Sequence, residues 1–191
     1  TARALAGDEL QLLGRDPGRE ADSLEELCCW AYGITPGLHR WREDCLLLEI
    51  GGCLRLFGGL AALLASVDRG LAQRALSCRR GLAPTPKAAW LLSFAGEPAA
   101  SAIERPLEER LAPLPLARLA ALLPALGALE EPGLARLGDV LALPERALGR
   151  RCGREAVTLL QQVTGRAHDR QPAFQPPLRF RARHRFGYEV T

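Results

Sequence analysis

A single acidic residue at the end of an apolar run is the feature of this sequence best suited to chemistry. Residues 45–50 read Cys-Leu-Leu-Leu-Glu-Ile and are followed by a pair of glycines. An apolar run of this length predicts a strand that is buried on both faces. The carboxylate of Glu49 would be costly to bury there without a partner or a metal ion. Strand-end carboxylates of this kind can hold the two divalent cations used in phosphoryl transfer.

The cysteines and histidines show no spacing that is typical of a metal site or of a nucleophilic catalytic site. No Cys-x-x-Cys pair occurs, and no histidine lies at zinc-finger spacing. His39, His168 and His184 fall in expected loops or in the tail, without a nearby Ser or Cys motif. We therefore expect no metal and no cofactor, and we interpret the cysteines as free thiols of a reducing cytosol. The six cysteines are Cys28, Cys29, Cys45, Cys53, Cys78 and Cys152.

The composition favours helices and permits a nucleic-acid partner without requiring one. Apolar residues make up 48% of the 191 residues and aromatic residues 5%, and the formal net charge is +3. Lys87 is the only lysine, and a GC-rich genome explains this arginine bias more readily than selection for phosphate binding does. No apolar run reaches 18 residues, so we expect no membrane span. Because the chain begins at Thr1 and contains no Met, we expect a fragment or a processed form.

The elements that must position these residues form an α+β arrangement. Apolar residues at 60, 63, 64, 67 and 71 follow the helical period, and Asp22 or Ser23 can cap an earlier helix. For the first half we expect helices at 24–31, 60–71 and 87–95 and strands at 45–50 and 76–82. After a Leu-Pro-rich entry at 111–115, we expect helices at 116–126, 134–143 and 144–164. In the tail, residues 166–191, arginines alternate with apolar residues, and a basic strand beside nucleic acid and a solvated linker fit equally well.

Four stretches in this order resemble the second half of a Y-family DNA polymerase core. Residues 48–50, Leu-Glu-Ile, match the end of the strand motif that carries catalytic carboxylates in that family. Residues 81–84, Gly-Leu-Ala-Pro, match the start of a later motif, and 133–140, Gly-Leu-Ala-Arg-Leu-Gly-Asp-Val, match a stretch of the thumb. Residues 150–153, Arg-Arg-Cys-Gly, resemble the segment that follows it.

Further motifs are similar to a catalytically inactive branch of that family, found in bacterial mutagenesis cassettes. They are Trp-Ala-x-x-x-Thr-Pro at 30–36, Leu-Phe-Gly-Gly at 56–59 and Thr-Pro-x-Ala-Ala-Trp at 85–90. The resemblance implies a partial polymerase palm, a mixed sheet with packed helices, followed by a small all-helical thumb. It divides the chain into an end of the fingers (1–20), a partial palm (21–105), the thumb (106–165) and a basic linker toward a little-finger domain (166–191).

The same resemblance implies that the catalytic positions are vestigial. Asp44 falls on the catalytic Asp and Cys45 on the catalytic Glu, while Pro86 and Trp90 occupy two lysine positions of the later motif. A thiol is a poor ligand for Mg²⁺, which prefers oxygen. We interpret Asp44 as a turn residue and Glu49 as a partnered strand-end carboxylate, so we expect no catalytic residue.

The thumb and the tail carry the residues that could bind DNA weakly and without sequence preference. Glycines in a helical hairpin allow a phosphate to approach backbone N–H groups, and arginines nearby add charge. A thumb that only packs, with solvated arginines, is the alternative. The candidates are Gly133, Arg136, Gly138, Arg146, Arg150, Arg151, Arg179 and Arg181, with Arg154 beside them.

The resemblance implies a cytoplasmic, nucleoid-associated scaffold in SOS mutagenesis and translesion DNA synthesis. Its expected partners are DNA, the sliding clamp, a RecA-related companion and an error-prone replicative-type polymerase, bound mostly through regions outside this chain. An active translesion polymerase with a divergent metal site is one alternative. A helical DNA-binding module with an unrelated α/β partner domain is another.

Overall fold

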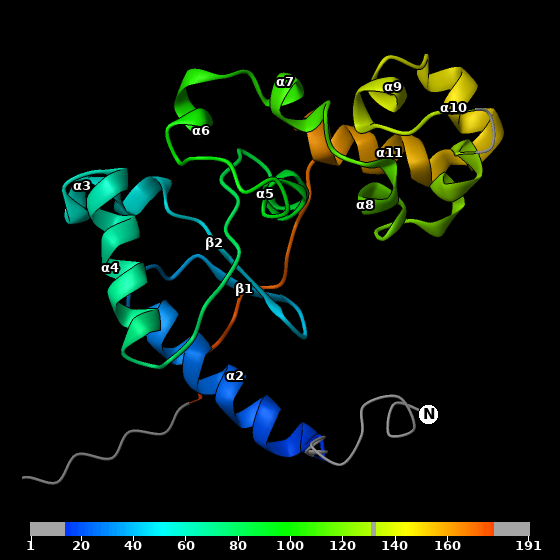
Figure 1. The fold of residues 1–191 in the computed structure, drawn as a ribbon. Helices are drawn as coiled ribbons and strands as arrows, with labels where there is room; N and C mark the ends of the chain where they lie inside the picture. Colours follow the sequence, from blue (N-terminus) through cyan, green and yellow to red (C-terminus); the bar gives the residue numbers. More distant parts are fainter. Residues whose placement is uncertain (1–13, 131–132, 178–191) are drawn as a thin grey trace, which may run out of the picture. The chain divides into compact units, whose positions relative to one another are not determined.

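The computed structural model describes residues 14–130 and 133–177, which fall into two compact units (Figure 1). Of the described residues, 14–53 and 172–177 belong to the first unit, and 54–130 and 133–171 belong to the second. Helices and a short sheet both occur, which confirms the predicted α+β class. Among the described residues, no single helix is both long and apolar enough to cross a membrane, although Gly51–Phe57 and Leu60–Ala72 meet that test as a bent pair.

The first unit is built on helix α2, Pro17–Tyr32, which packs against strand β1, Leu38–Arg42. The carboxylate of Asp16 accepts the backbone N–H groups of Gly18 and Arg19, both at 3.1 Å. Pro17 suits the first helical position because its missing N–H would have no partner there. The predicted start of this helix at Asp22 or Ser23 was therefore wrong, because Asp16 provides an earlier cap.

Strand β1 pairs antiparallel with β2, Cys45–Leu48, and a short 3₁₀ turn, η1 (Gly51–Cys53), follows. Cys28, Ala31 and Leu38 form the centre of this unit's core, and Phe174 packs against it. The predicted mixed sheet was wrong, since the described sheet is a two-stranded hairpin. Every residue of β2 is half-buried, so the predicted full burial was also wrong. A strand with one neighbour on a two-stranded hairpin lacks the second layer that full burial requires.

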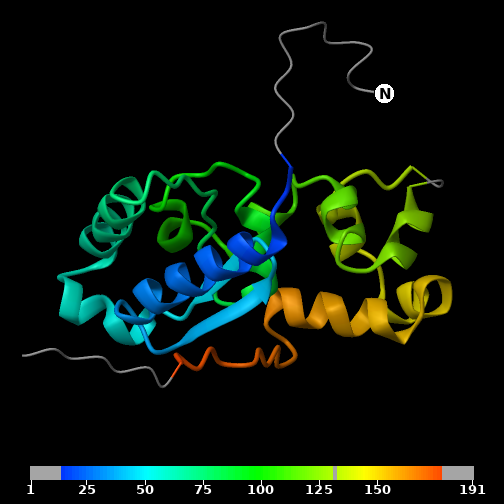
Figure 2. The same cartoon turned by 90° about the horizontal axis from the view of Figure 1, so that it is seen from below.

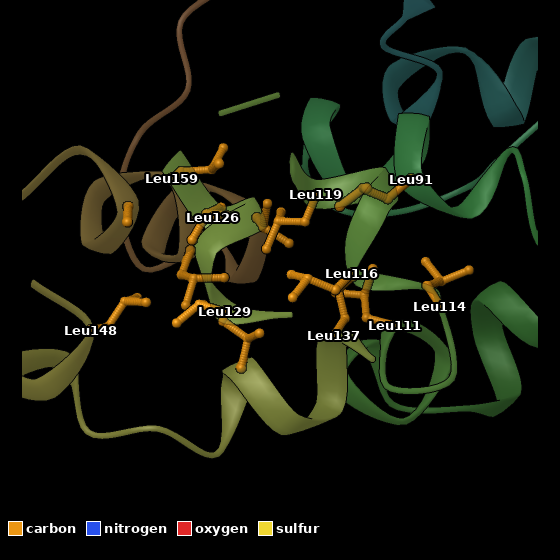
Figure 3. Close-up of a cluster of buried hydrophobic side chains, with 14 of the residues drawn as sticks. Leu91, Leu111, Leu114, Leu116, Leu119, Leu126, Leu129, Leu137, Leu148 and Leu159 are labelled. Atoms are coloured by element: carbon orange, nitrogen blue, oxygen red, sulfur yellow. The ribbon is translucent and has the colours of Figure 1, made fainter. Parts of the chain in front are cut away.

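The second unit consists of helices joined by turns. Its core is leucine-rich, and Figure 3 shows Leu111, Leu116 and Leu137 converging from three helices. Ala88, Leu91 and Leu92 of α5 belong to the same core, so apolar packing continues across residue 106, where the thumb was expected to begin. The elements are α3 (Leu54–Phe57), α4 (Leu60–Ala72), α5 (Pro86–Leu92), α6 (Ser101–Glu104), α7 (Leu107–Leu111), α8 (Leu116–Ala120), η2 (Pro124–Leu129), α9 (Leu137–Leu141), α10 (Glu145–Cys152) and α11 (Arg154–Thr164).

Helix α4 confirms the predicted apolar stripe, since Leu63 and Leu71 are buried on one side of it. The predicted strand at 76–82 was wrong, because this segment is an extended loop in the described structure. Gly81 of this loop lies so close to α5 that a Cβ atom would overlap backbone atoms of Ala89 and Ser93. The segment therefore packs against a helix instead of pairing with a strand.

The predicted helix at 144–164 is two helices, α10 and α11, which meet at Gly153 (Figure 2). Gly153 has φ 86° and ψ 169°, a conformation that residues with a Cβ atom rarely adopt. Pro144, the first residue of the predicted helix, lies at the N-cap of α10, so the helix begins one residue later than predicted. The chain turns at Gly153, so α10 packs back on α11.

Candidate nucleic-acid interface

Asp44 and Glu49, which match positions of the Y-family strand motif with catalytic carboxylates, lie at the two ends of β2. Asp44 is exposed in the turn before the strand, and Glu49 is exposed just after it. Five residues of extended chain separate them by about 17 Å. Two cations of a nucleotidyl-transfer site lie about 3.5–4 Å apart, so these two carboxylates cannot hold the same metal pair.

Cys45, which the resemblance aligns with a catalytic Glu, is half-buried at the start of β2. Burial first, and then the nearby carboxylate of Asp44, raise the pKa of the Cys45 thiol to about 11. The side chain is therefore neutral at physiological pH. A neutral thiol cannot replace a carboxylate as a ligand of a hard cation.

Glu49 takes part in the local turn that follows β2. Its carboxylate accepts the backbone N–H of Gly51 at 2.8 Å, and its carbonyl oxygen accepts the Thr35 hydroxyl at 2.7 Å. Gly37 lies so close to Glu49 that a Cβ atom would be 2.8 Å from the Glu49 Cβ. These contacts give Glu49 the partnered strand-end role that its sequence position predicted.

Four exposed arginines, which we call the α10 arginine surface, lie on α10 and at the start of α11: Arg146, Arg150, Arg151 and Arg154. Arg146 and Arg150 are one helical turn apart and therefore neighbours. Within the described part of the chain, no carboxylate lies within 4.0 Å of these four guanidinium groups. The surface therefore keeps its positive charge available to an anionic partner.

The only acidic residue of α10 is already engaged. Glu145 pairs with Arg166 at 3.0 Å and accepts a hydrogen bond from the side-chain amide of Gln161 at 3.1 Å. Arg150 and Arg151 also border an apolar groove of about 560 Å³. The groove is lined by Leu129, Leu134, Leu143, Ala147 and Leu148.

The start of α9, where the sequence suggested a phosphate site, is occupied by the protein itself. The Asp139 carboxylate accepts the backbone N–H groups of Ala135 and Arg136 at 3.2 and 3.0 Å. The N–H groups of Leu137 and Gly138 donate to carbonyl oxygens of the segment before α8, at 2.9 and 3.0 Å. These four donors are therefore unavailable to a phosphate, and a negative charge already lies beside two of them.

The predicted site residues of this region differ in their surroundings. A Cβ atom on Gly138 would be 3.0 Å from the Cβ of Ala112, so this glycine permits close packing within the unit. Gly133 is exposed, has φ +89° and has open space around it. Arg136 is exposed, and its guanidinium donates to the carbonyl of Pro113 at 3.5 Å. Arg179 and Arg181 lie outside the described residues.

Sequence reasoning missed two groups of charged residues in the second unit. Lys87 forms a largely buried ion pair with Asp169, which ties the segment after α11 to α5. Arg79 and Arg118 lie over the ring of Phe94. These partners lie far apart along the chain, so no local sequence pattern predicts their contacts. One clue was available, because Lys87 is the only lysine in the sequence.

The similarity to known proteins extends over most of the chain. Protein ImuB from two strains of Caulobacter vibrioides, NA1000 / CB15N and ATCC 19089 / CIP 103742 / CB 15, is 36% identical over 176 residues in each case. The match covers 90% of this chain but spans only 38% of the curated relatives. No family model and no solved structure matches the chain.

Proposed function

Because this chain is homologous to ImuB over nine tenths of its length, we propose that it is part of a non-catalytic, polymerase-like scaffold in damage-induced mutagenesis. The homology carries this proposal, and it agrees with the order of motifs that resemble an inactive Y-family polymerase. In this role the chain takes part in SOS-dependent translesion synthesis and acts in the cytoplasm at the nucleoid.

The absence of catalysis is supported by the surroundings of the vestigial positions. Asp44 lies in a hairpin turn, Glu49 caps the turn after β2, and the thiol of Cys45 is neutral. None of the three is arranged to coordinate Mg²⁺ together with another carboxylate of the described residues. The protein would act by holding other molecules.

DNA binding by this chain would be weak and independent of sequence. The α10 arginine surface supplies exposed guanidinium groups without carboxylate partners among the described residues, and such groups bind phosphates in any sequence context. The exposed Arg136 and Gly133 would add to this binding, and Arg179 and Arg181 would add basic charge from the tail. Since Gly138 is packed against Ala112, the arginines contribute most of the binding.

The partners beyond DNA follow from the proposed role as a scaffold. The protein would connect the sliding clamp, an ImuA-like RecA-related protein and an error-prone replicative-type polymerase. The chain spans 38% of its curated relatives, so most of these contacts would involve regions outside it.

Primer extension by the full-length protein, with Mg²⁺ or Mn²⁺, tests the proposal together with DNA binding at 50 and 200 mM salt. We expect binding that weakens at the higher salt concentration and no incorporation of nucleotides. Incorporation that is lost in Asp44→Ala or Glu49→Ala would instead establish the alternative, an active translesion polymerase with a divergent metal site. Absence of DNA binding at both salt concentrations would contradict the scaffold's proposed contact with DNA.

A further inference from the structure

The apolar groove of about 560 Å³ beside α10, which we call the α10 groove, lies in the second unit. Leu129 and Leu148, which are 1% exposed, line it and belong to the leucine-rich core, so the groove lies directly over that core. The half-buried Leu134, Leu143 and Ala147 complete its apolar lining. Its volume falls within the range of about 300–1,000 Å³ that is usual for ligand pockets. The groove is therefore large enough to hold several side chains of a partner.

The α10 groove carries positive charge at its border. Arg150 and Arg151 line it, and they follow Ala147 by three and four residues, so all three lie on the same side of α10. Both arginine side chains are exposed, and no carboxylate of the described residues lies within 4.0 Å of either guanidinium group. Of the described carboxylates within two residues of a lining side chain, Glu145 is already ion-paired and Glu130 is exposed. The two arginines therefore outnumber the one unpaired carboxylate of this part of the described chain.

This combination of apolar lining and basic border suits a protein segment better than a nucleic acid. Protein interfaces place apolar side chains at the centre and charged ones at the rim, and amphipathic segments insert apolar side chains into grooves of this kind. Single-stranded nucleic acids bind instead through aromatic side chains on which the bases stack. None of the described residues that line the groove is aromatic. The phosphates of duplex DNA would pair with the arginines but would leave the leucines uncovered.

We propose that the α10 groove binds an acidic, amphipathic segment of a partner protein. The apolar side chains of this segment pack on Leu134 and Leu143, and its carboxylates pair with Arg150 and Arg151. Carboxylates match these groups because a guanidinium can donate two parallel hydrogen bonds to one carboxylate. The inference goes beyond the proposed function and does not require a contact with DNA. Since both arginines also belong to the α10 arginine surface, the segment and DNA would compete for them.

The test measures the binding of fluorescein-labelled synthetic peptides to the full-length protein by anisotropy. Two probes of about twelve residues contain only leucine, aspartate and serine, with the leucines at helical spacing in one and at alternating positions in the other. Control peptides replace either every aspartate with asparagine or every leucine with serine. We expect at least one probe to bind, and both of its control peptides to bind about tenfold more weakly. No saturable binding of either probe would overturn the proposal.

A pair of leucine variants tests the apolar lining. L143Q places a polar amide in the groove, and L107Q makes the same change at another half-buried leucine that packs on the same core. We expect L143Q to weaken peptide binding about tenfold and to leave DNA binding as it is in L107Q. Equal peptide affinity in the two variants would overturn the proposal. An equal loss of peptide and DNA binding in L143Q would also overturn it, because the groove would then belong to the DNA site. If L143Q does not fold, A147F fills the groove without removing a leucine from the core and gives the same measurement.

A pair of arginine variants tests the basic border. R150Q/R151Q removes the two arginines of the groove, and R69Q/R105Q removes two other exposed arginines of the same unit and therefore the same net charge. We expect R150Q/R151Q to weaken binding of the acidic probe about tenfold more than the control variant does. The preference for aspartate over asparagine should also disappear. A preference that persists in R150Q/R151Q would overturn the pairing of carboxylates with these arginines.

The peptide and DNA measurements separate this proposal from the proposed function. Binding of a peptide probe without binding of duplex DNA would leave the groove proposal standing while the DNA contact fails. Binding of DNA without binding of either probe would overturn the groove proposal alone. Self-association of the full-length protein that L143Q abolishes, without binding of either probe, would assign the groove to a second copy of the protein and would overturn the proposal.

Discussion

Cys45 shows how burial changes the chemistry that is possible for a thiol. Its pKa of about 11 lies about two units above the ordinary value of 9.0, because the folded chain buries the thiol beside Asp44. Below pH 9 the fraction of thiolate is therefore about 100-fold smaller in the folded chain than in the unfolded chain. This difference can be measured directly.

We predict that iodoacetamide alkylates Cys45 about 100-fold more slowly in the native protein than in urea at pH 8, since only the thiolate reacts. The native rate should rise about tenfold per pH unit up to about pH 11. Peptide mapping by mass spectrometry measures the rate at each cysteine, and the exposed Cys29 provides an internal comparison. A native rate at Cys45 that levels off near pH 9 would contradict the raised pKa.

Asp139 sets a second residue-scale prediction, because its carboxylate occupies the start of α9. Asp139→Ala should lower the free energy of unfolding by about 1 kcal/mol, as the loss of a helix cap usually does. The same change should strengthen DNA binding, since it removes a negative charge and frees two N–H groups. Urea unfolding and DNA anisotropy give the two quantities.

The control for Asp139→Ala should remove a carboxylate that has no ion-pair partner among the described residues. Asp68→Ala is unsuitable because Asp68 pairs with Arg80. Glu108→Ala is suitable because Glu108 is exposed on α7. Weaker DNA binding in Asp139→Ala would show that this carboxylate does not compete with phosphate.

At the scale of elements, the loop between α4 and α5 depends on the close approach of Gly81 to α5. We predict that Gly81→Ala lowers the free energy of unfolding by about 3 kcal/mol, because its Cβ would overlap backbone atoms that cannot move alone. Gly127→Ala is the matched control, since a Cβ there meets nothing within 4 Å. Urea unfolding of both variants checks the prediction. Equal stability of the two variants would mean that the loop does not pack on α5 in solution.

The same elements show what the sequence could and could not predict. Helix α4 was predictable because its apolar residues repeat with the helical period. The segment at 76–82, Leu-Ser-Cys-Arg-Arg-Gly-Leu, was not, because its sequence does not show whether it pairs with a strand or packs on a helix. The arginines of α10 were identified because they lie within one helix. The Arg79–Phe94–Arg118 cluster was missed because only the fold brings residues so distant in sequence together.

At the scale of the whole molecule, the formal net charge of +3 could attract DNA without any particular surface. The proposed function requires instead that the attraction to DNA comes from one surface of the protein. Replacing the four residues of the α10 arginine surface with Gln changes the formal net charge of this chain from +3 to −1. Replacing four other exposed arginines, Arg19, Arg40, Arg55 and Arg69, produces the same net charge. The two quadruple variants have the same net charge, so a difference between them shows the effect of where the arginines lie.

We predict that the α10 variant of the full-length protein loses most of its affinity for duplex DNA at 50 mM salt, whereas the control variant loses a small part. If each of the four arginines neutralises one phosphate, the slope of log K against log salt should fall by about 3.6 in the α10 variant. Anisotropy titrations from 50 to 200 mM salt give both slopes. Equal losses in the two variants would show that binding follows net charge, and the α10 arginine surface would then have no special part in it. A selective loss would place the phosphate contacts on α10 and the start of α11, where four guanidinium groups lie exposed without acidic partners in the described chain.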